Sequence, residues 1–239
     1  MAVNDNIRAF LTETYLQYGI DTVIELAVEE LKISGSNGKD FSTRMNGELC
    51  ETILELIFAD YAKDHPEQCK DWFSVRGLIL QDPTGKKRKK FMTELDYTLF
   101  TPQCVYLFEC KSYSGDKRLM GDGKLMRETG NSCDVYSQSL VHADALDKNI
   151  GVFANGKPTY SINMFNFSRG PLSDMRSEMA KKLFPCYNVG NVTSAIRDSQ
   201  NVVWDIGYLK PLIRKLEANS VNLRSAHLNY VRGLHPKHD

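Results

Sequence analysis

The sequence predicts a mixed α/β fold with helical additions at both ends. Apolar residues recur with a helical period near both termini, and three strand-like segments follow one another between residues 72 and 111. A further helix and a further strand come after them. The predicted core is thus a helix, a three-strand antiparallel meander, a helix and a strand. We expect an N-terminal helical extension over 1–40, the core over 41–200 and a C-terminal helical extension and tail over 201–239.

The N-terminal part reads as helices. Residues 4–33 carry two amphipathic patterns, and "GSNGKD" (35–40) interrupts them with two glycines, which favours a loop. A further helix is predicted over 42–64. Its buried stripe, spaced by three and four, consists of Leu49, Ile53, Leu56 and Ile57.

A strand is predicted over 72–80, and "QDPTG" (81–85) has the residues of a turn. The turn leads into five consecutive basic residues, which are Lys86, Lys87, Arg88, Lys89 and Lys90. Such a run can contact a phosphate backbone and release its counterions. It is equally consistent with a solvated hairpin tip.

Residues 91–115, "FMTELDYTLFTPQCVYLFECKSYSG", read as a hairpin whose turn centres on Pro102 and Gln103. A symmetric hairpin about that dipeptide opposes residues whose numbers sum to 205. Asp96 then faces Glu109, Glu94 faces Lys111, and all four side chains share one face. The other face is apolar and predicts a core.

Two opposed carboxylates repel unless a cation lies between them. Mg²⁺ takes one or two carboxylates and fills its other positions with water and substrate phosphate. A lysine two residues beyond one ligand can orient or help to deprotonate a water molecule that attacks phosphorus. The hairpin therefore suits metal-dependent phosphodiester hydrolysis, and its alternative is a solvated rim of cross-strand salt bridges.

The rest of the chain is predicted to contain a loop, helices and one further strand. A glycine-containing loop is predicted over 115–132, a helix over 133–149, a strand over 160–168 and mostly helices over 172–232. "GDGK" (121–124) lacks the spacing of a Walker phosphate loop and is taken as part of the loop.

Composition limits the function classes. Thirty Lys and Arg balance thirty Asp and Glu, which argues against binding to nucleic acid or membrane by bulk charge alone. Six scattered cysteines without a CxxC pair, and no apolar leader at the start, predict reduced thiols in a cytoplasmic protein. No segment reaches the ~20 apolar residues of a membrane span.

The motifs resemble those of the PD-(D/E)XK superfamily, the restriction-endonuclease-like fold, and within it the nuclease-related domain (NERD) subgroup. The similarity rests on Gly47-Glu48 in the first core helix, Asp96 at a strand end and Glu109-Cys110-Lys111 on the next strand. A helical Gln138 and the apolar strand "SINMFNFS" follow in the same order. The likeness covers about residues 42–200, although an Asn-Pro pair and a Trp that are common in the subgroup are absent.

The resemblance implies roles for these residues. Asp96, Glu109 and the backbone carbonyl of Cys110 would hold Mg²⁺ or Mn²⁺, with Glu48 as a further acid. Lys111 would activate or position the attacking water, and Gln138 would complete the site through that water or the phosphate.

The expected function is that of a metal-dependent nuclease acting on DNA, with RNA as an alternative substrate. Two other readings stay open at this point: a nucleic-acid-binding protein on the same fold that does not cleave, and an interaction module with a charged rim. The amphipathic terminal helices could pack on the core or on a second copy in a homodimer.

Overall fold

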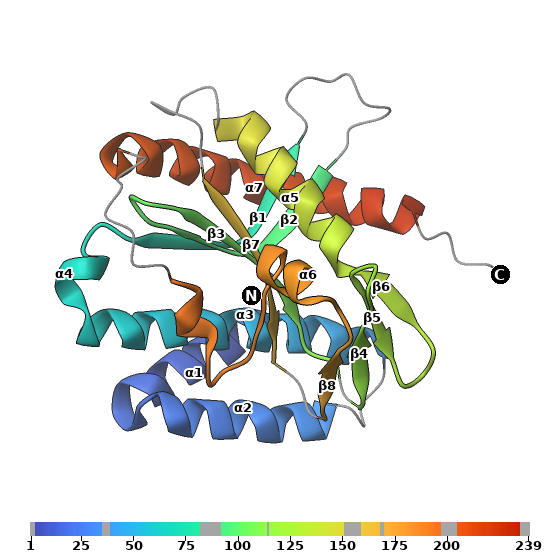
Figure 1. Ribbon diagram of the computed structural model, residues 1–239. Coiled ribbons are helices and arrows are strands. Elements are labelled where there is room, and N and C mark those ends of the chain that lie inside the picture. The colour runs from blue at the N-terminus through green and yellow to red at the C-terminus, as the bar shows by residue number, and fades with distance from the viewer. Residues whose placement is uncertain are drawn as a thin grey trace. The chain divides into compact units, whose positions relative to one another are not determined.

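A computed structural model describes residues 3–34, 39–81, 92–113, 115–150, 159–167, 170–196 and 205–234 (Figure 1). The chain divides into two compact units. Unit 1 comprises Met1–Lys70, Glu109–Ser137 and Asn163–Asp198, and Unit 2 comprises Asp71–Phe108, Gln138–Ile162 and Ser199–Asp239. Both units combine helices and strands, so the predicted mixed α/β class with helices at both ends of the chain is confirmed.

Unit 1 begins with four helices: α1 (Val3–Tyr18), α2 (Ile20–Ser34), α3 (Lys39–Asp64) and the short α4 (Pro66–Cys69). The first three pack against one another. The predicted stripe of α3 is buried, with Leu49 and Ile53 at most 1% exposed. Across this packing, Tyr15 donates a hydrogen bond to Asp60 at 3.1 Å and the Lys63 ammonium lies 4.0 Å from the Tyr15 ring centre.

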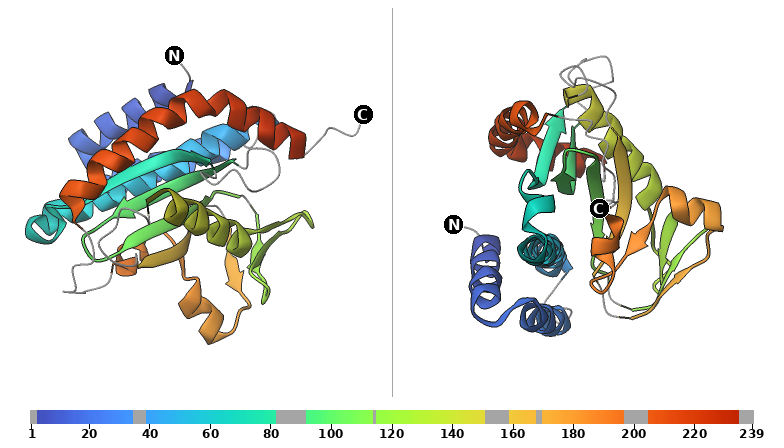
Figure 2. Two further views of the ribbon diagram at one scale, coloured as in Figure 1. Left: turned by 90° about the horizontal axis from the view of Figure 1, so that it is seen from above. Right: turned by 60° about the vertical axis from the view of Figure 1, so that its left-hand side comes forward.

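A small sheet in Unit 1 corrects the loop predicted over 115–132. Three strands form there, β4 (Lys117–Leu119), β5 (Lys124–Arg127) and β6 (Ser132–Asp134), and the sheet order is β6-β5-β4-β8. Figure 2 shows these strands in green beside the orange strand β8 (Leu172–Asp174). Alternation explains them: Leu119 and Leu125, which are register partners, are completely buried between exposed or half-buried neighbours. Glycine content and charge masked this two-residue period.

The β4–β5 turn depends on Gly123, which supports a stability prediction. Its φ is +83°, and a Cβ built there would lie 2.6 Å from the Cβ of Tyr136. Gly123→Ala should therefore cost roughly 2 kcal/mol, from left-handed backbone strain plus steric overlap. Urea unfolding measures this cost as a lower midpoint. Gly121→Ala is the matched control, because nothing lies within 4 Å of a Cβ there; equal shifts for both variants would contradict the prediction.

The remaining elements of Unit 1 add two short strands, β8 and β9 (Cys186–Tyr187), to the region 172–232 that is predicted to be mostly helical. After β8 come α6 (Glu178–Leu183), β9 and the 3₁₀ helix η2 (Val192–Ala195), and the long helix starts at residue 206. Part of β7 (Tyr160–Asn166) pairs in parallel with β9 through Met164 and Cys186. The two-residue strand β9 exists only through this pairing, so periodicity could not reveal it.

Unit 2 contains β1 (Phe73–Gln81), β2 (Met92–Phe100) and the first part of β3 (Val105–Lys111), each antiparallel to the next. The β2–β3 ladder pairs Tyr97 with Phe108 and Phe100 with Val105, so the predicted sum of 205 is confirmed. Thr101 closes the turn, accepting from and donating to Cys104 at 3.0 Å through its hydroxyl. The larger sheet has the order β1-β2-β3-β7-β9.

The Unit 2 core joins these strands to α5 (Val135–Ile150) and α7 (Ile206–Leu234). Phe73 and Phe100 stack with ring centres 4.7 Å apart. Ser220 of α7 accepts from the Ile79 N–H and donates to its carbonyl, both at 3.0 Å, which satisfies backbone groups of β1. The core residues are Phe73, Val75, Leu78, Leu80, Leu95, Phe100, Val105, Leu107, Ala145, Leu146, Ile150, Leu209 and Ile213.

His227 of α7 supports a prediction about pH. Burial lowers its pKa, and Arg224 lowers it further, while Glu94, with its carboxylate 3.4 Å from His227 Nδ1, acts in the opposite direction. The ring is therefore neutral when folded, and the unfolded chain binds a proton first as the pH falls below about 6.5. We expect the free energy of unfolding to decrease from pH 7.5 to 5, and His227→Gln should reduce that decrease. Urea unfolding at three pH values tests this, with the exposed His65→Gln as control; an unchanged slope in His227→Gln would contradict it.

None of the helices in the described residues is both long and apolar enough to cross a membrane. The basic run Lys86–Lys90 lies outside the described residues, so its predicted contact with phosphates stays a prediction.

Candidate active site

The end of strand β3 brings two predicted catalytic residues into contact. Glu109 and Lys111 are two positions apart, so strand geometry places their side chains on one face. The Lys111 ammonium donates a hydrogen bond to Glu109 Oε1 as an ion pair. Both residues belong to Unit 1.

The Glu109–Lys111 pair is withdrawn from water, as is the pair Arg176–Asp174 of the same unit, with side chains 2% and 24% exposed. The side chain of Glu109 is 0% exposed and that of Lys111 is 11% exposed, whereas the pair Lys124–Asp122 is about half exposed. Taking two charges out of water is costly, and a buried pair is weak evidence for stability alone. A solvated rim of salt bridges would leave these groups in water, so the geometry favours a functional site over a rim.

The segment after Lys111 is held by a second buried lysine. Lys117 is 1% exposed, and its ammonium donates to the backbone carbonyls of Tyr113 at 3.1 Å, Gly115 at 2.6 Å and Gly170 at 3.4 Å. Burial lowers the pKa of Lys117. These bonds tie the chain after β3 to the chain before β8.

The Tyr113 side chain also contacts residues of strands β5 and β6. The Arg127 guanidinium lies 4.6 Å from its ring centre, and its hydroxyl lies 3.8 Å from the Cys133 sulfur. Burial is the main reason that the pKa of Tyr113 is raised. The residues beside Lys111 are therefore anchored by Lys117 and by Tyr113.

The other predicted site residues of Unit 1 are Glu48 and Cys110. Glu48 is half-buried on α3, and Cys110 lies between Glu109 and Lys111 with a half-buried side chain. All six cysteines are free thiols. Metal binding by Glu48 and by the Cys110 carbonyl stays a prediction.

Asp96 and Gln138 belong to Unit 2. Asp96 is half-buried on β2, next to Tyr97, where the assigned ladder with β3 ends. Gln138 is exposed on α5. Glu94, which the hairpin register predicts opposite Lys111, has carboxylate oxygens 3.6 Å from Arg224 and 3.4 Å from His227.

The donor set has the chemistry of a hard-cation site. Carboxylates and a backbone carbonyl are the oxygen ligands that Mg²⁺ and Mn²⁺ prefer. Within the described residues, no three His, Cys, Asp or Glu side chains cluster as a metal-binding group. The predicted ligand set includes three such side chains, those of Glu48, Asp96 and Glu109, and it stays a prediction.

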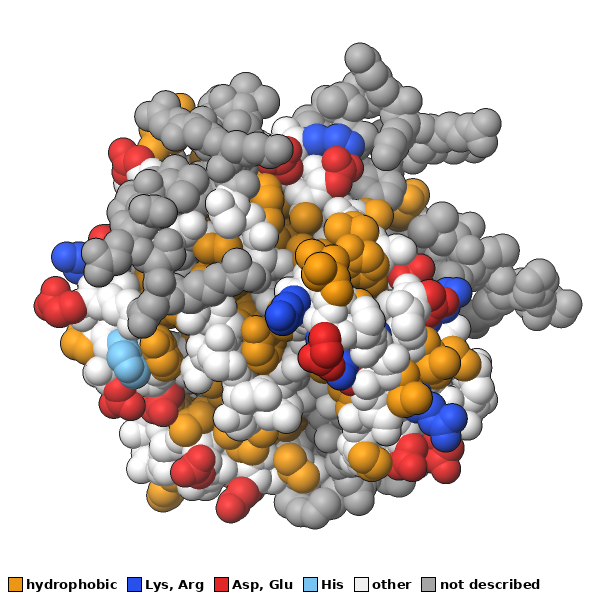
Figure 3. All heavy atoms as spheres, in the orientation of Figure 1, with side chains coloured by type: hydrophobic (Ala, Val, Ile, Leu, Met, Phe, Trp, Pro, Cys, Tyr) orange, Lys and Arg blue, Asp and Glu red, His pale blue; other side chains and the backbone are white. Residues whose placement is uncertain are grey.

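Surface charge gives no broad basic area on the face shown in Figure 3. On the described residues of that face, acidic and basic side chains are interspersed. This agrees with the formal net charge of zero. Binding of a polyanion would therefore depend on local groups rather than on a bulk field.

Lys117 is a site-supporting residue that the sequence reading missed. It looks like one more charged residue in a charged stretch, "GDKRLMGDGK". Lys117 and Leu119 are buried while Asp116 and Arg118 are exposed, so Lys117 occupies an inward position of β4. Only the pairing of Lys117 with Leu172 of β8 reveals this alternation.

Comparison with known proteins agrees with the sequence resemblance. Residues 51–166 match the family model of the nuclease-related domain. No curated protein matches the chain significantly. Among solved structures, protein VC1899 from Vibrio cholerae shows 12% identity and a TM-score of 0.38, over 80% of this chain and 48% of that chain. The chain thus spans about half the length of that protein.

Proposed function

We propose that the protein is a metal-dependent nuclease acting on DNA. The proposal starts from the match of residues 51–166 to the nuclease-related domain. The observation that carries the proposal is the buried pair of Glu109 and Lys111 at the end of β3. An acid and a lysine two residues apart, both withdrawn from water, are the groups that hydrolysis of a phosphodiester requires.

The chain's residues divide the work as follows. Asp96, Glu109 and the Cys110 carbonyl would hold Mg²⁺ or Mn²⁺, with Glu48 as a further acid. When bound, the cation lowers the pKa of water and stabilises negative charge on the phosphate. Lys111 would position or activate the attacking water, and Gln138 would contact that water or the phosphate.

Water and the phosphodiester are the only reactants that this hydrolysis needs. The oxygen of water forms a bond to phosphorus while the bond from phosphorus to the leaving oxygen breaks, and that oxygen receives a proton. The products are a hydroxyl end and a phosphate monoester end. The proposed compartment is the cytoplasm, since six free thiols suit a reducing environment.

The first test is cleavage of plasmid DNA, single-stranded DNA and RNA with Mg²⁺, Mn²⁺ or a chelator. Metal-dependent cutting of DNA supports the proposal. If only RNA is cut, the substrate is RNA instead of DNA, and the proposed hydrolysis of phosphodiester bonds still holds. No cutting of any polymer, combined with tight nucleic-acid binding, would favour the binding protein without cleavage.

Metal binding gives a separate prediction for Glu109→Gln. The amide keeps the shape of the side chain but removes its charge, so affinity for Mn²⁺ should fall at least tenfold. Titration calorimetry with Mn²⁺ measures this in the absence of substrate. Glu128→Gln, in the β5–β6 turn of the same unit, is the control; equal Mn²⁺ affinity in wild type and Glu109→Gln would contradict the assignment.

A further inference from the structure

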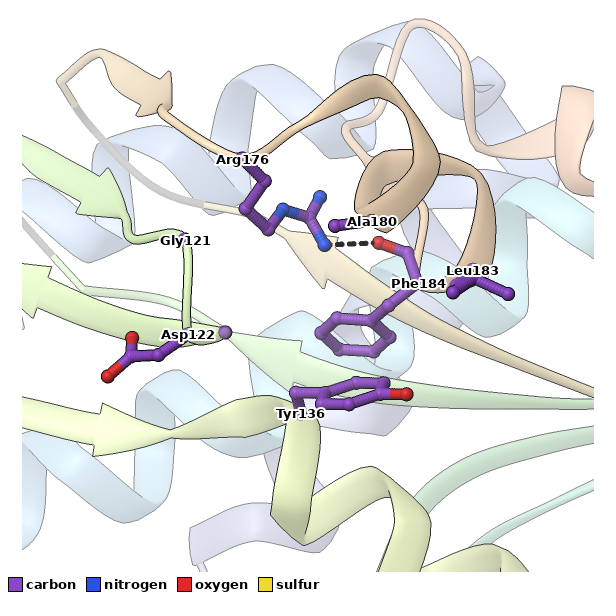
Figure 4. A pocket seen from close by; sticks show the side chains of 8 residues that line it. Gly121, Asp122, Tyr136, Arg176, Ala180, Leu183 and Phe184 are labelled. Carbon is purple, nitrogen blue, oxygen red and sulfur yellow. Dashed lines mark hydrogen bonds between the residues drawn. The ribbon is translucent and has the colours of Figure 1, made fainter.

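Unit 1 contains a pocket of about 160 Å³ that the proposed site does not use. Its walls come from the β4–β5 turn, the first turn of α5 and helix α6 (Figure 4). Tyr136, Ala180, Leu183 and Phe184 supply apolar surface, and Arg176 supplies a charged group. The lining is therefore mainly apolar and aromatic, which is typical of a site for a small organic group.

Two aromatic rings shape one side of the pocket. The Tyr136 and Phe184 ring centres lie 5.4 Å apart with planes tilted by 51°, and the Arg176 guanidinium lies 5.6 Å from the Phe184 ring centre. Figure 4 shows Phe184 between Arg176 and Tyr136, facing the turn that carries Gly121 and Asp122. Gly123 lets that turn approach Tyr136 closely, as its built Cβ shows.

The charges around the pocket do not form an anion site. Arg176 donates to both carboxylate oxygens of Asp174, at 2.8 and 2.7 Å, and to the Phe184 carbonyl at 2.5 Å. Asp122 is bonded to the Lys124 ammonium at 2.8 Å, and its carboxylate is turned away from the two rings in Figure 4. Arg176 and Asp122, the two charged residues that line the pocket, are each already paired with an opposite charge. The pocket therefore suits a neutral planar group rather than a phosphate.

Size restricts the planar group. An apolar cavity of about 150 Å³ accommodates a single six-membered ring such as benzene. The pocket here has about that volume, so one ring is enough to fill it. Proteins that hold an unpaired nucleobase place it against aromatic or apolar side chains in a pocket of this kind.

Helix α6, which supplies part of the pocket wall, also carries basic residues. Helix α6 carries Lys181 and Lys182 in its last turn, next to the lining residues Leu183 and Phe184. Lys182 is exposed, and Lys181 is paired with Glu178 at 2.7 Å. An exposed cation beside an apolar pocket can meet the phosphate that flanks a bound base.

We propose that this pocket binds one unpaired nucleobase of pyrimidine size from the nucleic-acid substrate. The inference rests on the proposed function, and it assigns a strand with unstacked bases as the preferred substrate. Tyr136 and Phe184 bind the ring by stacking or edge contact, and Lys182 binds an adjacent phosphate.

Fluorescence anisotropy tests the pocket in the Lys111→Ala background with a chelator present, so that no strand is cut. The probes are labelled 12-mers: oligothymidylate, oligoadenylate, and a strand of the same length with abasic residues only. The parent should bind oligothymidylate more tightly than either of the other strands. Tyr136→Ala should weaken binding of oligothymidylate about 5- to 150-fold, the range for loss of one base–aromatic contact, and leave abasic binding unchanged.

A second variant keeps the test valid if Tyr136→Ala does not fold. Ala180→Phe fills the pocket without removing a wall, and it should weaken oligothymidylate binding to a similar extent. Tyr208→Ala, at an exposed tyrosine of α7, is the matched control and should bind as the parent does. Circular dichroism establishes that each variant is folded.

Each outcome decides between the two proposals. Metal-dependent cleavage by the wild-type protein, combined with equal binding of abasic and thymidylate strands, overturns the pocket proposal alone. The same holds if folded Tyr136→Ala and Ala180→Phe both bind as the parent does, and equal affinity for oligoadenylate overturns the size assignment. A protein that neither cuts nor binds any strand overturns the proposed function and this inference with it.

Discussion

Lys111→Ala should reduce metal-dependent DNA cleavage by roughly 10²- to 10⁴-fold, the contribution expected of a positioned acid–base group. The side chain is 11% exposed and contacts Glu109, so its removal takes the group proposed to position the attacking water out of a water-poor site. A supercoiled plasmid nicking assay with Mg²⁺ or Mn²⁺ measures the rate. The loss should appear in the maximal rate rather than in DNA affinity, because one cation contributes little to the binding of a polyanion.

Two controls distinguish chemistry from charge. Lys124→Ala removes an exposed lysine of β5 in the same unit and should leave the cleavage rate near that of wild type. Lys111→Ala should still bind Mn²⁺ in calorimetry, since lysine is not a ligand. Cleavage that survives Lys111→Ala would place the chemistry elsewhere in the chain or in a contaminant.

Lys117→Met should lower the free energy of unfolding by about 2–4 kcal/mol. The substitution leaves the carbonyls of Tyr113, Gly115 and Gly170 without the buried ammonium from which they accept hydrogen bonds. Methionine carries no charge, so the variant avoids the cost of burying an ammonium. The expected decrease in the free energy of unfolding is therefore smaller than the sum for three lost hydrogen bonds. For a chain of this length the melting temperature should fall by roughly 5–15 °C.

Urea unfolding and thermal melting both measure this effect, and Lys124→Met provides the control. Lys124 pairs with Asp122 at the surface, where such pairs contribute at most about 1 kcal/mol. A folded Lys117→Met protein should also cut DNA more slowly, because the segment after Lys111 loses an anchor. Equal unfolding midpoints for Lys117→Met and Lys124→Met would show that the three carbonyls find other donors.

Local patterns predicted the parts of the fold in which neighbours along the chain decide the structure. The Pro102–Gln103 turn set the β2–β3 register, and the ladder from Tyr97 to Phe100 follows it. The three- and four-residue spacing in α3 identified the stripe that is buried, including Leu49 and Ile53. In both cases the prediction needs only residues that are close in the chain: the spacing within one helix, or the residues of one turn.

Patterns failed where strands are short and their partners are distant. Strands β4, β5 and β6 are three or four residues long, too short for a two-residue period to stand out among glycines and charges. Strand β8 forms only because it pairs with β4, more than fifty residues earlier. For the last helix, α7, the pattern left open packing on the core or on a second copy, and the structure places Leu209 and Ile213 in the core of Unit 2.

The sequence by itself determined the mixed α/β class, the hairpin register and the presence of Glu109 and Lys111 on one strand face. Those features follow from backbone periodicity and turn geometry, which act between residues that are close in the chain. Only the tertiary structure decided that Glu109 is withdrawn from water, that Lys117 is buried among three carbonyls, and that Tyr136 and Phe184 line a pocket. Burial depends on which distant segments pack together, and the cost of an unpaired buried charge then selects the partner of each polar group.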